Sequence, residues 1–143
     1  RLGLTCIRAA TADAREKHAA WEGQADVVMA DVPCSGLGII RKKPDIRYKN
    51  PKELAQLPLV QRAILENASG YVRPGGTLVY STCTVLPEEN EDVTGDFLDK
   101  HPEFEPVRTA FPLPVGPCPG QVTLWPQRHG TDGFYICRMR RKD

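Results

Sequence analysis

The sequence predicts an α/β domain: the back half of a doubly wound fold, with a mostly parallel sheet and an antiparallel edge strand. Apolar runs of strand length, at residues 25–30, 77–82 and 134–139, alternate with helical patterns. The first two runs each end in a polar, cysteine-containing segment, at residues 31–36 and 81–84. Ligands bind at the carboxyl ends of neighbouring parallel strands, so we expect two thiols and the Asp31 carboxylate on one rim.

The composition fits a single globular domain. The chain has 143 residues, a net charge of +1 and 41% hydrophobic residues, which argues against disorder. It has no apolar run of about 18 residues, so we predict no membrane-spanning helix. Its first residues do not resemble a signal peptide, and the abrupt opening without Met indicates a piece of a longer chain.

Two strands and a loop are expected first. Residues 4–9 have the pattern of a short strand. Residues 25–30 are apolar except for Asp26, which is typical of a strand buried on both faces. We expect the next segment to be irregular, because it contains the turn-forming residues Gly36, Gly38, Pro44 and Asn50.

Helix signals follow on both sides of the second strand. Asn50 has the position of an N-cap before Pro51, and apolar residues from Leu57 to Val72 recur at helical spacing. Pro58 is expected to kink this helix or to split off its first turn. A second helix begins after Pro87 in an acidic run and ends at residues 101–102.

The carboxyl-terminal part is predicted to be mostly extended or irregular. Residues 103–128 are rich in Pro and Gly, with one strand expected near residues 122–124. Residues 130–133 form a turn before the last strand, at residues 134–139. We expect this strand to be antiparallel and to lie at the sheet edge.

The five cysteines have no paired spacing, which favours a reduced, cytoplasmic protein. A disulfide between Cys34 and Cys83 is the less favoured alternative. Cys6 and Cys137 are predicted to be core thiols. A zinc site formed by Cys118, His129 and Cys137 is disfavoured, because their spacing matches no zinc finger or zinc ribbon.

Several motifs resemble those of the Sun family of RNA cytosine-5 methyltransferases, and most closely its bacterial members that act on small-subunit ribosomal RNA. They are Asp31-Val32-Pro33-Cys34-Ser35-Gly36, Ile40-Arg41-Lys42-Lys43-Pro44-Asp45, the segment 75–84, Leu86-Pro87-Glu88-Glu89-Asn90 and the segment 130–135. Pro-Cys and Thr-Cys, followed by Pro-Glu-Glu-Asn, form a specific combination. The resemblance implies a Rossmann-like, S-adenosylmethionine-dependent methyltransferase fold. Residues 1–143 would be a partial catalytic domain without the upstream glycine loop and RNA-binding domain.

The resemblance also implies a covalent mechanism. Cys83 would add to carbon 6 of cytosine, and carbon 5 would then accept a methyl group from S-adenosylmethionine. Cys34 would assist proton removal from carbon 5 and release of the product. Asp31 would hydrogen-bond ring nitrogen 3 and the amino group. DNA cytosine methyltransferases instead use the Cys of Pro-Cys as the nucleophile, and in that alternative Cys34 and Cys83 exchange roles.

By the same resemblance, Asp13, Asp31 and Pro33 are the candidate cofactor contacts, with Asp13 at the position that meets the adenine amino group. The glycine-rich loop of the family has no counterpart in the first 30 residues. We therefore expect the chain alone to bind the cofactor weakly or not at all and to be inactive. The strand at residues 27–29 would expose an apolar edge, which favours self-association.

A basic segment follows the first cysteine and predicts contact with RNA phosphates. Its cations are Arg41, Lys42, Lys43, Arg47, Lys49 and Lys52, against the single acid Asp45. Ile46 and Tyr48 within it could stack or pack. Two other functions remain open from the residues alone: a non-catalytic RNA-binding module, and a thiol-redox protein that uses Cys34 and Cys83.

Overall fold

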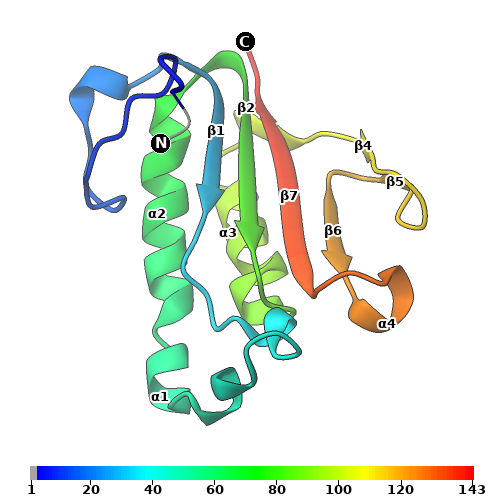
Figure 1. Cartoon of the computed structure of the whole chain (residues 1–143). Coiled ribbons are helices and arrows are strands. Elements are labelled where there is room, and N and C mark those ends of the chain that lie inside the picture. The colour runs from blue at the N-terminus through cyan, green and yellow to red at the C-terminus, as the bar shows by residue number, and fades with distance from the viewer. Residues whose placement is uncertain (1–2) are drawn as a thin grey trace.

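The computed structural model describes residues 3–143 as a mixed sheet with helices against it (Figure 1). The main sheet has the order β1-β2-β7-β3, and β6 also pairs with β7. Its strands are β1 (Ala25–Asp31), β2 (Val72–Thr82), β3 (Phe104–Pro106), β6 (Gln121–Leu124) and β7 (Phe134–Arg141). Two short strands, β4 (Thr109–Ala110) and β5 (Pro117–Cys118), pair separately.

The helices lie between these strands in the chain. The α-helices are α1 (Pro51–Leu54), α2 (Leu57–Tyr71), α3 (Glu91–Lys100) and α4 (Pro126–His129). Short 3-10 turns are η1 (Ala19–Trp21), η2 (Leu37–Ile39), η3 (Pro44–Tyr48) and η4 (Pro87–Glu89). Within residues 3–143, no helix combines the length and the apolar character that crossing a membrane requires.

The α/β class and the direction of the last strand are confirmed, but the position of that strand is not. β1 and β2 are parallel, whereas β7 runs antiparallel to β2, β3 and β6. The last strand is therefore interior rather than at the edge. The reason lies in residues 103–128, whose β3 pairs with the end of β7 and whose β6 pairs with its start. Within this chain, the parallel part of the sheet is the β1–β2 pair.

The predicted helix signals are confirmed. The side chain of Asn50 accepts a hydrogen bond from the backbone N of Lys52 at 3.0 Å, as an N-cap does. The chain then breaks between α1 and α2, close to Pro58, so the first turn is separate. α3 begins after η4 and is capped at its end by His101.

The core lies between the sheet and α2 and α3. Leu65 of α2 and Val93 of α3 are fully buried, as are Leu78, Tyr80 and Tyr135 of the sheet. These side chains alternate along β2 and β7, so each strand turns one face towards the helices.

The amino-terminal predictions are wrong in two respects. Residues 4–9 form no strand, and Cys6 is exposed rather than in the core. β1 is not buried on both faces, because Val27 is 61% and Met29 70% exposed. Val27 and Met29 alternate with Val28 and Ala30, which pack against the core, so they lie on the opposite face of β1 and meet solvent.

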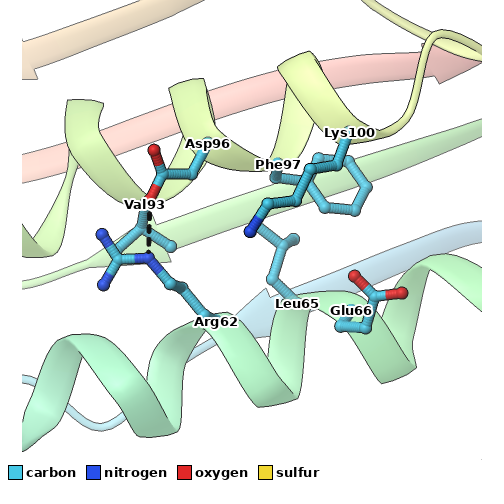
Figure 2. A pocket seen from close by; sticks show the side chains of 7 residues that line it. All are labelled: Arg62, Leu65, Glu66, Val93, Asp96, Phe97 and Lys100. Carbon is cyan, nitrogen blue, oxygen red and sulfur yellow. Dashed lines mark hydrogen bonds and ion pairs between the residues drawn. The ribbon is translucent and has the colours of Figure 1, made fainter.

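A small hollow separates α2 from α3 (Figure 2). Its volume is about 30 Å³, which is enough for about one water molecule. Arg62 and Asp96 form an ion pair across it at 2.9 Å. The hollow is a feature of helix packing and is too small for a substrate.

Candidate active site

The structure brings the two predicted cysteines into contact. Cys34 follows β1 and Cys83 follows β2, and because the two strands are adjacent and parallel, both thiols reach the same rim. Their sulfur atoms are 3.2 Å apart. The backbone N of Cys83 also donates to Cys34 Sγ at 3.3 Å. Both thiols are free and half-buried.

The surroundings keep Cys34 in its thiol form. Burial raises the pKa of Cys34, and its hydrogen bond with Cys83 raises it further. A thiol with a raised pKa is a poor nucleophile at neutral pH, because the thiolate is the reactive species. The environment of Cys34 therefore suits a group that carries a proton.

Asp31 lies on the same rim at the end of β1, directly beside Ser81. Ser81 Oγ donates to Asp31 Oδ1 at 2.8 Å. Asp31 itself is exposed, which leaves its carboxylate accessible to a ligand.

The three predicted cofactor contacts line one cavity of about 350 Å³ beside β1. Asp13, Asp31 and Pro33 contribute to its wall, and the rest is largely apolar or aromatic. The Asp13 carboxylate pairs with Arg15, whose guanidinium lowers the pKa of Asp13 to about 2. His18 also lines the cavity, and its buried Nε2 has no hydrogen-bond partner. A cavity with acids, aromatic rings and a free polar nitrogen fits a nucleoside-like group.

The basic segment divides into cations with partners and cations facing solvent. Arg41 and Lys42 both pair with Asp132, which lies in the turn before β7. The hydrogen bond from Lys42, together with the positive charges of Lys42 and Arg41, lowers the pKa of Asp132. Lys49 Nζ donates to the carbonyl of Ser35 at 2.8 Å, so this lysine contacts the loop of Cys34 itself.

The structure also distinguishes Ile46 from Tyr48. Ile46 is buried, whereas Tyr48 is 80% exposed. The Arg47 guanidinium lies 5.9 Å from the centre of the Tyr48 ring. Lys43 and Arg47 are exposed beside them. This surface combines an accessible aromatic ring with positive charge.

Sequence reasoning missed the polar residues beneath the cysteines. Ser35, Gln61, Glu89 and Asn90 are buried and hydrogen-bonded around the two cysteine loops. The acidic run containing Glu89 was interpreted only as a helix start, where acids suit the helix dipole. The available signal was the Pro-Glu-Glu-Asn motif itself. It follows Thr-Cys closely in the sequence, which indicates that its side chains support the cysteine loop.

The remaining thiols lie elsewhere. Cys137 is in the core of β7, as predicted, and burial raises its pKa to about 11. Cys118 is also buried. Among residues 3–143, no group of three or more His, Cys, Asp or Glu side chains is arranged to hold a metal ion.

The pair of thiols lies at the carboxyl ends of adjacent parallel strands, which is where an α/β sheet binds its ligands. The model of the 16S rRNA methyltransferase RsmB/F family matches residues 1–140, and the chain belongs to that family. It is 46% identical over 149 residues to the probable ribosomal RNA small subunit methyltransferase B of Bacillus subtilis, covering 99% of this chain and 33% of the relative. It is 41% identical to ribosomal RNA small subunit methyltransferase B of Thermus thermophilus, covering 82% and 30%. The chain thus spans about a third of the length of these relatives.

Solved structures support the same family. The crystal structure of PH0851 matches with a TM-score of 0.86 at 34% identity, over 97% of this chain and 32% of that one. The structure of NSun6 from Pyrococcus horikoshii with SFG, an analogue of S-adenosylmethionine, matches with a TM-score of 0.66 at 29% identity, over 84% and 31%. The Rossmann-like methyltransferase fold is therefore shown for this chain, as the sequence predicted.

Proposed function

We propose that this chain is the base-activating part of an S-adenosylmethionine-dependent RNA cytosine-5 methyltransferase, with small-subunit ribosomal RNA as its substrate. The observation that carries the proposal is the 3.2 Å contact between Cys34 and Cys83 on the rim that also holds Asp31. Membership of the RsmB/F family and the names of the relatives support an RNA substrate.

Cys83 is the attacking group. Its thiolate adds to carbon 6 of a cytosine and forms a carbon–sulfur bond, so electron density moves to carbon 5. Carbon 5 then accepts a methyl group, which is the chemistry that bound S-adenosylmethionine supplies. Asp31 hydrogen-bonds ring nitrogen 3 and the amino group, and Ser81 holds its carboxylate in position.

Cys34 assists in the second half of the reaction. A water molecule takes the proton from carbon 5, the electron pair of that bond re-forms the carbon 5–carbon 6 double bond, and the carbon 6–sulfur bond breaks. The Cys34 thiol, 3.2 Å from Cys83 Sγ, assists by hydrogen-bonding the departing Cys83 thiolate, and the methylated base is released. The raised pKa of Cys34 supports this assignment over one in which Cys34 attacks.

The cofactor lies in the cavity beside β1. Asp13, Asp31 and Pro33 would hold it there, with the aromatic residues of the wall excluding water. Residues 1–143 form a partial catalytic domain, and the rest of the cofactor site comes from outside the chain. Alone, the chain is therefore inactive.

RNA binds over the basic segment. Arg41, Lys42, Lys43, Arg47 and Lys49 attract phosphates, which holds the strand while the target base enters the site. The free state of all five cysteines supports a reducing, cytoplasmic environment.

The chain also self-associates through β1. Its outer edge has no partner among the described strands, and Val27 and Met29 are exposed beside it. An unpaired apolar edge is a template for another strand.

The test of the function uses the full-length protein that contains this chain. The Cys34→Ala variant is mixed with total RNA and S-adenosylmethionine and run on a denaturing gel. We expect a protein–RNA adduct that disappears when Cys83 is also changed to Ala. Loss of methylation with no adduct would instead favour Cys34 as the nucleophile.

Two other functions give different results. A non-catalytic RNA-binding module predicts no methylation and RNA affinity that is indifferent to Cys83→Ala. A thiol-redox protein predicts a reversible disulfide between Cys34 and Cys83 and no dependence on the basic segment.

A further inference from the structure

Asn90 spans the residues on both sides of Cys83. Its Oδ1 accepts a hydrogen bond from Thr82 Oγ1 at 2.6 Å, and its Nδ2 donates to the carbonyl of Thr84 at 3.2 Å. Asn90 is fully buried, so water does not compete for these bonds. One amide side chain therefore fixes the turn that presents the Cys83 thiol.

Glu89, its neighbour in the chain, holds the other cysteine loop. Glu89 Oε2 accepts from the backbone N of Ser35, the residue after Cys34, at 2.9 Å. The same oxygen accepts from Gln61 Nε2 at 2.7 Å, and Gln61 Nε2 also donates to the carbonyl of Pro33 at 3.0 Å. Pro33 and Ser35 flank Cys34, so Glu89 and Gln61 together fix that thiol from both sides.

Two further bonds tie these groups into one unit. Tyr80 OH donates to the carbonyl of Glu89 at 2.6 Å, which fixes the Glu89 backbone to β2. Ser35 Oγ donates to Thr84 Oγ1 at 2.8 Å and links the two cysteine loops directly. Because Glu89 and Asn90 are adjacent, the two loops share a single anchor.

A buried carboxylate such as that of Glu89 is an unfavourable group for a purely structural anchor. Glu89 is 2% exposed, none of the ion pairs in the described part of the chain includes it, and its Oε1 is buried without a hydrogen-bond partner. Burial of a carboxylate is unfavourable unless it is compensated. What it provides is a charge-assisted bond to the Ser35 N–H, which is stronger than a neutral one.

We propose that Glu89 and Asn90 are positioning residues that set the two thiols separately: Asn90 orients Cys83 for attack and Glu89 orients Cys34 for release. The inference rests on the proposed function and assigns roles to two residues outside the reacting groups. Adjacent residues of the Pro-Glu-Glu-Asn segment thus position the cysteines of both half-reactions. Both side chains are buried beneath the cysteine loops, so they act through the loops rather than on the substrate.

The test separates the two half-reactions in the full-length protein. Rapid mixing of the protein with RNA gives the rate of adduct formation. Decay of a pre-formed protein–RNA adduct gives the rate of release. Glu89→Gln is expected to slow release about tenfold, the difference between a charged and a neutral acceptor, while adduct formation stays near the wild-type rate. Asn90→Ala is expected to slow adduct formation more than release. Glu88→Gln, an exposed neighbour, is the matched control and should change neither rate.

A merely structural role predicts a different pattern. Both variants would then lower the unfolding temperature and reduce both rates in proportion, and that result overturns the inference. Where Asn90→Ala does not fold, Asn90→Asp keeps the acceptor for Thr82 but removes the donor to Thr84, and should still slow attack selectively.

A second measurement does not depend on activity. The oxidant diamide takes two electrons and two protons from two neighbouring thiols, which leaves a disulfide and reduces diamide to the hydrazine. The rate at which it couples Cys34 to Cys83 therefore reports the relative position of these thiols. Glu89→Gln and Asn90→Ala should slow this coupling at least severalfold relative to Glu88→Gln; an unchanged rate contradicts the inference. If the Cys34→Ala protein forms no adduct at all, the proposed function fails and this inference with it. If that adduct forms but release is normal in Glu89→Gln, the inference alone fails.

Discussion

Gly38 and Gly133 meet backbone to backbone beneath the site. The N–H of Gly133 donates to the carbonyl of Gly38 at 2.8 Å, and the N–H of Gly38 donates to the carbonyl of Cys83 at 3.0 Å. A Cβ atom on Gly38 would lie 2.0 Å from the carbonyl oxygen of Gly133. The loop after Cys34, the turn before β7 and Cys83 therefore interlock at a point where only glycine fits.

Gly38→Ala is consequently expected to destabilise the chain by about 3 kcal/mol, the upper range for an overpacked site. The clash involves backbone on both sides, so a side-chain rotation cannot relieve it. Urea unfolding followed by circular dichroism measures the change. Gly95→Ala in α3 is the control, because nothing lies within 4 Å of the added Cβ and alanine favours a helix. A Gly38→Ala variant as stable as Gly95→Ala would refute the interlock.

The raised pKa of Cys34 predicts slow alkylation at neutral pH. Iodoacetamide reacts with the thiolate, so Cys34 should remain largely unmodified near pH 7. It should become reactive only when the pH rises well above the pKa of an ordinary thiol. Peptide mass spectrometry measures each cysteine, and the exposed Cys6 is an internal standard. Replacing Cys83 by Ser weakens one cause of the shift and should move the Cys34 profile to lower pH. Equal rates for Cys34 and Cys6 at pH 7 would contradict the prediction.

His101 predicts a pH-dependent part of the stability. Burial alone lowers the pKa of His101, but hydrogen bonds to Glu103 and Glu66 outweigh it and leave the pKa raised. A raised pKa in the folded state stabilises the protein below the unfolded value of about 6.5, and this stabilisation disappears as the pH rises through the folded pKa. The free energy of unfolding should therefore differ more between the wild type and Glu66→Gln at about pH 5.5 than at about pH 8.5. The same difference at both values would show that His101 is not the cause.

Tyr48 is expected to stack on a base of the RNA strand. It is exposed beside Arg47 and next to Lys49, which contacts the Cys34 loop. Base stacking on an aromatic ring contributes about 1–3 kcal/mol, so Tyr48→Ala should weaken binding of a single-stranded RNA by about fivefold or more. Fluorescence anisotropy measures this, and Tyr48→Phe, which keeps the ring, should bind like the wild type. Equal weakening by both variants would implicate the hydroxyl rather than stacking.

The open edge of β1 predicts a mass that depends on concentration. Light scattering of the 143-residue chain should give more than a monomer at high concentration. Met29→Lys puts a charge beside the edge and should restore the monomer. A monomeric mass for the unchanged chain at all concentrations would count against self-association.

The sequence was sufficient where local chemistry decides structure. Asn50, Pro51 and Pro58 predicted the start and the break of the first helix, because capping and the missing proline N–H act within one turn. The rim carrying Asp31, Cys34 and Cys83 followed from the rule for parallel strands.

The sequence was insufficient where distant segments decide. The pairing of β3 and β6 with β7 depends on partners 10 or more positions apart. A strand was expected near residues 122–124, but a run this short does not indicate which strand it pairs with. The buried role of Glu89 could not be predicted, because its partners, Ser35 and Gln61, lie 54 and 28 positions away. Val27 and Met29 are exposed, because an apolar side chain is buried only where another element packs against its face of the sheet.

The cavity beside β1 has one further consequence, which is optical. The chain has two tryptophans, and Trp21 lies in the wall of that cavity, with its ring centre 4.5 Å from that of His18 and 5.6 Å from that of Tyr71. Trp125 lies at the start of α4, outside the cavity. A ligand that enters changes the surroundings of one indole and not the other. With Trp125 replaced by Phe, the intrinsic fluorescence of the protein becomes a direct, label-free signal of occupancy.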